Sequence, residues 1–216
     1  MKNWSRKRKL ILCVVILLIS LFFITSITEW PSPTLQIAIA RAEKQMLIGP
    51  SEIIDKLDFE YSSWDHLVLG ETQYGYITYE YQDGLGWDNG YLRYFEKTDT
   101  ATAFTTDYPY HTDNDQWLPI IVIPENTKST SAKLTLAING IESSRDIQLE
   151  ADQSETGYFL FALPTRDLDA ELYWLLQQAI SGSWQEYVLT GTVEIQINFY
   201  DRSGTLVDTY SKTVTK

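Results

Sequence analysis

Three aspartates in one acidic stretch are the residues best placed to bind a metal ion. Asp107, Asp113 and Asp115 fall within nine residues of one another. Calcium is bound by several oxygen atoms from one folded loop, so such a cluster could hold it. The D-x-D-x-D-G spacing of the common calcium loop is absent, and acidic loops are usually only solvated. We therefore predict no metal site and no cofactor, with these three aspartates as the calcium candidates.

The residue patterns of nucleophilic and zinc-dependent catalysis are missing. The only two histidines, His66 and His111, lie far apart, and the only cysteine, Cys13, lies in an apolar run. A zinc site favours clustered His and Cys, and a serine hydrolase of the G-x-S-x-G type needs that elbow, which does not occur. We predict no catalytic residues and a protein that is not an enzyme. A glycosidase-like carboxylate pair needs only proximity in space, which the sequence does not reveal, so that chemistry is the alternative.

A glycine-rich segment superficially resembles a phosphate-binding loop. Residues 84–90 read GLGWDNG. The dinucleotide-binding motif is G-x-G-x-x-G and opens a helix. Here the last glycine comes one residue late and a strand pattern follows, which indicates a long hairpin loop.

Aromatic residues are abundant, with 14 Tyr and 7 Trp. Their flat apolar faces and polar handles suit both β-sheet interiors and recognition surfaces. Trp64, Trp87 and Trp117 fall in or beside predicted loops. They are our candidates for contact with a sugar or peptide ligand, and the alternative is that they fill the interior.

One apolar run dominates the start of the chain. Leu10 to Ile27 contains 18 uncharged residues, which is about the length of helix that crosses a bilayer. We predict a transmembrane anchor at residues 10–28 that inserts into the lipid bilayer, with a cytoplasmic tail at residues 1–9. A cleaved signal peptide is the alternative, although Ser26-Ile27-Thr28 is a poor cleavage site.

Charge is divided sharply along the sequence. Five of the 17 Lys and Arg residues precede residue 10, and the first acidic residue is Glu29. From Glu29 onward, 12 basic residues stand against 29 acidic ones, a net charge of −17. The basic end predicts a cytoplasmic N-terminus and an extracytoplasmic location for residues 29–216. The acidic remainder excludes nucleic acid as a partner and favours a basic or cation-bridged one over anionic lipid.

The first part after the anchor has the pattern of a small α+β module, residues 34–108. Helical spacing runs from Thr34 to Leu47 and ends at Gly49-Pro50. Ser51 could cap a second short helix over residues 52–57. Strand patterns follow at residues 66–71, 74–82 and 91–97, which predicts an antiparallel meander, and a short strand is expected near residues 103–105.

The rest of the chain, residues 115–216, has the pattern of an all-β, immunoglobulin-like sandwich. Strands are expected at intervals of about ten residues, and Asn139-Gly140 is a strong hairpin signal. One helix interrupts the strands and ends before Gly182. The predicted strands span residues 118–123, 133–139, 146–150, 157–163, 187–200 and 205–214, and the helix spans residues 168–180.

These features together predict a single-pass protein of the cell membrane. Because residues 29–216 contain no cysteine, a bacterial envelope protein fits better than an animal secreted one. We expect a non-catalytic binding or assembly module that the anchor concentrates near an envelope protein or glycan partner. The alternative is an envelope enzyme that acts on wall polymers through paired carboxylates.

Overall fold

A computed structural model describes most of the chain. For residues 24–28, 110–111 and 181 it describes the backbone alone. The described residues are 6–28, 32, 34–58, 66–81, 90–106, 110–111, 116–126, 128–140, 144–166, 168, 170–181 and 191–215.

The described residues form helices α1 (Arg6–Thr28), α2 (Leu35–Gln45) and α3 (Ala170–Ser181). The helix predicted from Thr34 is confirmed as α2, and the Thr34 hydroxyl accepts a hydrogen bond from the Ile37 amide at 3.3 Å, which caps its first turn. The helix predicted before Gly182 is confirmed as α3. Within the described residues, no helix combines the length and the apolar character needed to cross a membrane.

The first sheet is an antiparallel meander of four strands in chain order. It contains β1 (Glu52–Asp58), β2 (His66–Glu71), β3 (Gly75–Tyr81) and β4 (Tyr91–Glu96). The predicted meander is confirmed, but the short helix predicted over residues 52–57 is wrong, because this segment is β1. Ile53 packs on one face of the sheet, and Ile54 and Leu57 pack on the other, so pairing with β2 buries both sides of the segment.

Two further antiparallel sheets follow. The middle sheet has the order β10-β7-β5, and β6 also pairs with β7; the outer sheet has the order β12-β11-β8-β9. The middle sheet contains β5 (Ala101–Thr105), β6 (Tyr110–His111), β7 (Gln116–Pro124) and β10 (Phe159–Pro164). The outer sheet contains β8 (Ser131–Asn139), β9 (Ser144–Asp152), β11 (Thr192–Tyr200) and β12 (Leu206–Thr215).

The outer sheet contains two hairpins, and the first confirms a local prediction. Strands β8 and β9 form the hairpin expected at Asn139-Gly140, with Asn139 paired to Ser144. The turn between β11 and β12 places Gly204 at φ +79°, in the left-handed region that favours glycine.

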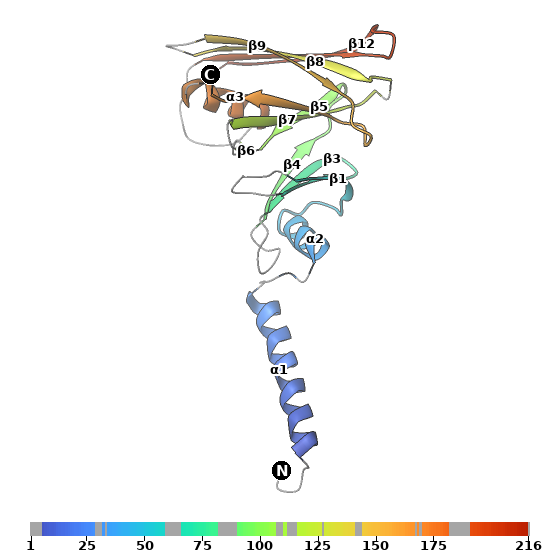
Figure 1. Ribbon diagram of the computed structural model, residues 1–216, viewed down its shortest axis with the longest axis vertical. Coiled ribbons are helices and arrows are strands. Elements are labelled where there is room, and N and C mark those ends of the chain that lie inside the picture. Colours follow the sequence, from blue (N-terminus) through green and yellow to red (C-terminus); the bar gives the residue numbers. More distant parts are fainter. Residues whose placement is uncertain are drawn as a thin grey trace.

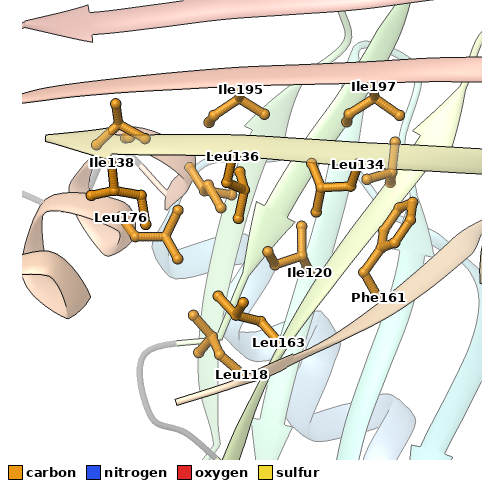
Figure 2. Packing of buried hydrophobic residues seen from close by; sticks show 14 of the residues in the cluster. Leu118, Ile120, Leu134, Leu136, Ile138, Phe161, Leu163, Leu176, Ile195 and Ile197 are labelled. Carbon is orange, nitrogen blue, oxygen red and sulfur yellow. The ribbon is translucent and has the colours of Figure 1, made fainter. Parts of the chain in front are cut away.

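The largest core lies between the middle and outer sheets. Alternate side chains of β7, such as Leu118 and Ile120, meet Leu134 and Leu136 of β8, and Leu176 of α3 closes one side, as Figure 2 shows. A β-rich fold of three antiparallel sheets is thus established, and two of these sheets share one hydrophobic core.

Two smaller cores join the remaining layers. Leu67 and Leu69 of β2 pack against Phe104 of β5 and Ile121 of β7, so the first sheet covers the free face of the middle sheet. Helix α2 packs on the opposite face of the first sheet. In Figure 1 the layers follow one another along the long axis, from α1 through α2 and the three sheets.

Candidate functional site

Five of the six candidate site residues predicted from the sequence lie outside the described part of the chain, and Trp117 lies within it. Outside are the ligand-contact candidates Trp64 and Trp87 and the calcium candidates Asp107, Asp113 and Asp115.

Trp117 belongs to a strand and contributes to the interior. It is the second residue of β7, where it pairs with Pro164 of β10 and with Tyr110 of β6. The side chain is half-buried and packs against the core between the first and middle sheets. Its ring therefore stabilises the junction of two layers, and its part in ligand contact stays a prediction.

The first and middle sheets share one end, where strand ends that border three undescribed segments lie together. In the first sheet, Asp58 pairs with His66 and His66 pairs with Tyr81, so the end of β1, the start of β2 and the end of β3 lie together. In the middle sheet β5 ends at Thr105. The Arg93 guanidinium donates a hydrogen bond to the Thr105 carbonyl oxygen at 2.9 Å, which holds the two sheets together near this end.

His66 and Asp58 form the one described pair at this end whose chemistry resembles that of a catalytic site. His66 Nδ1 lies 2.6 Å from Asp58 Oδ1, and the imidazole stacks on the Tyr81 ring with 4.8 Å between ring centroids. A carboxylate that holds one histidine nitrogen can orient the ring for proton transfer. Here the Asp58 side chain is 77% exposed and the His66 side chain is 19% exposed, so the pair contributes little stability.

The described residues provide no further partner for metal chemistry. Among them, no group of three or more His, Cys, Asp and Glu side chains is placed to hold an ion. The His66–Asp58 pair was not predicted from the sequence, because a helix over residues 52–57 implies no cross-strand pairing between Asp58 and His66. The cross-strand pairing of β1 and β2 is the signal that would have found it.

Other polar side chains in the interior hold the middle sheet to α3 and its own strands to each other. The Gln177 amide of α3 donates to the Thr106 carbonyl oxygen at 2.7 Å, and the Thr105 hydroxyl donates to the Pro119 carbonyl oxygen at 2.6 Å. Gln177 and Thr105 are both buried. Buried hydrogen bonds of this kind fix how neighbouring segments fit together, which is a structural role.

Asp55 ties β1 to the turn between β9 and β10. Its Oδ2 atom accepts hydrogen bonds from the Tyr158 hydroxyl at 2.9 Å and from the Thr156 hydroxyl at 3.0 Å. Burial, followed by the hydrogen bond to Asp55 and its charge, raises the pKa of the Tyr158 hydroxyl above its usual value of 10.0. This contact fastens the first sheet to the sandwich across about one hundred residues of chain.

A second connection lies at the end of β7. The Tyr76 hydroxyl donates to Glu125 at 3.4 Å, and the Lys97 ammonium lies 5.2 Å from the centre of the Tyr76 ring and pairs with Glu71. Burial, followed by the charge of Glu125, raises the pKa of the Tyr76 hydroxyl. Tyr76 thus packs on the face of the first sheet that turns toward the middle sheet.

Comparison with known proteins gives no relative. No protein-family model matches the chain, and neither the curated proteins nor the solved structures include a significant match. Its function is therefore inferred from its residues and their arrangement.

Proposed function

We propose that the protein is a membrane-anchored, non-catalytic binding or assembly module of the bacterial cell envelope. Residues 1–9 are cytoplasmic, residues 10–28 hold the protein in the bilayer, and residues 29–216 are extracytoplasmic. The anchoring goes beyond the described helices, none of which by itself has the length and apolar character of a membrane span. It rests on one observation: the apolar side chains of α1 that are described from Leu10 to Phe23 are almost all exposed.

The exposure of α1 calls for an apolar environment. The exposed large hydrophobic side chains between Leu10 and Phe23 have exposed fractions of 44–69%. They include every residue from Val14 to Ile19. Figure 1 draws α1 as a single helix that extends away from the layered body. Soluble proteins rarely leave so large an apolar surface in water, whereas lipid tails would cover all of it.

The charges at the start of α1 give the orientation. Arg6, Lys7, Arg8 and Lys9 occupy the first turn, and no acidic residue lies in that turn. Basic residues next to a membrane helix remain on the cytoplasmic side, so the layered body lies outside.

An immunoglobulin-like sandwich is the finer description of the fold that the strand order favours. In such a sandwich, strands A, B and E lie side by side in one sheet, and strands C, F and G lie in the other. Strands β5, β7 and β10 occupy the positions of A, B and E, while β8, β11 and β12 occupy those of C, F and G. Helix α3 is an insertion between the E-like and F-like strands.

The polar contacts favour binding over catalysis. The half-buried Asp55 and the buried Tyr158 and Arg93 join layers, as described above. A polar face is left on the outer sheet, where the Thr209 hydroxyl donates to Asn198 at 3.0 Å and Gln196 donates to the same Asn198 oxygen at 3.3 Å. Figure 1 places this sheet at the end of the molecule farthest from α1, where a partner could reach it.

Vesicle flotation tests the anchor. The full chain, synthesised in the presence of phospholipid vesicles, should float with them after alkaline extraction. Each arginine at the centre of a membrane helix costs about 2.5–3.5 kcal/mol, so Ile16→Arg combined with Leu17→Arg should lower the floating fraction at least tenfold. The matched control, Ile16→Leu with Leu17→Ile, should float like the original. Equal flotation of both variants, or none by the original chain, would contradict the anchor.

Binding and catalysis are separated in a second experiment. The full chain in lipid nanodiscs is mixed with purified cell-wall polymers, and both retention of polymer and release of soluble fragments are measured. Retention without release is expected. Release of fragments that disappears when a single Asp or Glu is replaced by its amide would establish the wall enzyme in place of the binding module.

A further inference from the structure

The outward face of α2 differs from the surface of the rest of the body. Leu35, Ala38 and Ile39 point into the core beneath the helix. The opposite side of the helix carries Ile37, Ala40 and Lys44, all three exposed, with half-exposed Arg41 beside them. This outward face is therefore apolar and cationic.

The one acidic residue of α2 is withdrawn from that face. Glu43 is buried, and its Oε1 atom accepts a hydrogen bond from the Ser51 amide at 2.9 Å. Arg41 keeps its position at the face while donating to the Ser32 hydroxyl at 3.1 Å. Residues 29–216 carry a net charge of −17, whereas the described residues of this face include two cations and no exposed acid.

The end of α2 adds an exposed leucine in an unfavourable backbone conformation. The Ile48 amide donates to the Glu43 carbonyl oxygen at 2.9 Å and the Leu47 amide to that of Lys44 at 3.3 Å, which is the Schellman arrangement. That arrangement puts Leu47 at φ +58°, where glycine is usual, and leaves its side chain 92% exposed. An apolar side chain in this position is better explained if an apolar layer covers it than if it faces water.

The chain keeps this face close to the end of α1. Thr28 and Leu35 are separated by six residues, which can span at most about 25 Å when fully extended. In Figure 1, α2 lies between α1 and the first sheet, so it is the layer of the body nearest to α1.

We propose that the outward face of α2 rests on the surface of the same bilayer and binds anionic phospholipid head groups. This inference depends on the anchoring proposed above. Lys44 and Arg41 lie among the phosphates, while Ile37 and Leu47 enter the boundary between head groups and acyl chains, as in other interfacial helices. The acidic surfaces of the body are repelled by the same lipids, so the contact orients the stack of layers away from the membrane.

Spin labels in nanodiscs test this contact in the full chain. With Cys13→Ser as background, a label is placed on Ala40→Cys at the outward face of α2 or, for reference, on Leu206→Cys at the far turn of the outer sheet. In discs that contain phosphatidylglycerol, the label at position 40 should collide several-fold less with a water-soluble nickel chelate than the label at position 206. Discs of phosphatidylcholine alone should reduce this difference.

Two charge variants supply the control. Lys44→Glu should return the label at position 40 to the nickel accessibility of position 206, whereas Lys128→Glu, with the same change in net charge at a distant exposed site, should not. Equal accessibility of positions 40 and 206 in anionic discs overturns the proposal. A label on Leu17→Cys separates the two failures: if it is embedded in lipid, only the contact of α2 is lost, and if it is open to water, the anchor fails as well.

Discussion

Leu47 and Gly204 both have positive φ angles, so substitutions at these two positions should change the free energy of unfolding in opposite directions. Leu47 is at φ +58° and Gly204 at φ +79°, and an added Cβ at Gly204 would meet no atom within 4 Å. The left-handed region costs an L-residue roughly 1 kcal/mol or more, while glycine adopts it freely. We expect Leu47→Gly to stabilise the fold by about 1 kcal/mol and Gly204→Ala to destabilise it by a similar amount, measured by urea unfolding in mild detergent. A loss of stability in Leu47→Gly would show that its side chain has a stabilising contact.

The Tyr158 hydroxyl offers a test that depends on pH. Tyr158 is 4% exposed, and its hydroxyl donates to the Asp55 carboxylate. Tyr158→Phe should therefore lower the free energy of unfolding by about 2 kcal/mol at neutral pH. Because burial raises the pKa of Tyr158 above 10.0 in the folded state, the tyrosine of the unfolded chain ionises first as the pH rises. The stability that Tyr158 adds over phenylalanine is therefore complete below pH 10 and falls above it, by up to about 1.4 kcal/mol per pH unit.

The measurement is the difference in unfolding free energy between the original chain and Tyr158→Phe from pH 7 to pH 11. Tyr74→Phe is the matched control, because Tyr74 is exposed and should show no such trend. A difference that stays constant through pH 11 would contradict the raised pKa of Tyr158.

At the scale of elements, α3 completes the main core. Leu172, Leu175 and Leu176 enter the cluster shared by the middle and outer sheets, and Lys212 of β12 donates to the Ala179 carbonyl oxygen at 2.7 Å near the C-terminal end of the helix. Leu176→Ala should destabilise the fold by about 3 kcal/mol because it leaves a cavity. Leu206→Ala, an exposed site, should change stability by less than about 0.5 kcal/mol in the same urea unfolding assay. Similar effects of the two would place α3 outside the stabilising core.

The elements that the sequence predicts well are those whose patterns are local. Helix α2 has a capping threonine and three- and four-residue spacing, and β11 alternates over its whole length, so both were predicted from their own residues. Strand β1 was not predicted from its own residues, because its register depends on β2 and on the cores on its two faces. A seven-residue segment with apolar residues on both sides can satisfy helix and strand patterns alike.

Candidate site residues were harder to predict, because their contacts join distant segments. Asp55 meets Tyr158 across about one hundred residues, and Tyr76 meets Glu125 across about fifty. No spacing rule connects such residues. Trp117 looked like a loop residue because polar residues precede it, yet pairing with β10 places it in a strand. Trp64 and Trp87 lie outside the described residues, so their contact with a ligand is still a prediction.

At the scale of the whole molecule, the middle sheet is buried on both faces. Along β7, Ile120 faces the outer sheet and the adjacent Ile121 faces the first sheet, and neither is exposed. This explains the unbroken apolar run LPIIVI, since a strand covered on both sides needs no alternation. Phe104 of β5 also contributes to this second interface. The division into modules at residues 34–108 and 115–216 stays a prediction.

The two faces of β7 allow a matched test of whether the layers unfold together. Ile120→Val and Ile121→Val remove the same methylene from opposite sides of one strand, each at a cost of about 1 kcal/mol. If the three sheets form one cooperative unit, the slowest-exchanging amides of β3 and of β8 should both exchange about fivefold faster in either variant, as followed by hydrogen exchange in the full chain. If each interface opens alone, Ile121→Val accelerates only β3 and Ile120→Val only β8. The polar contacts of Asp55 and Tyr76, which join the first sheet to the sandwich at separate points, favour the cooperative result.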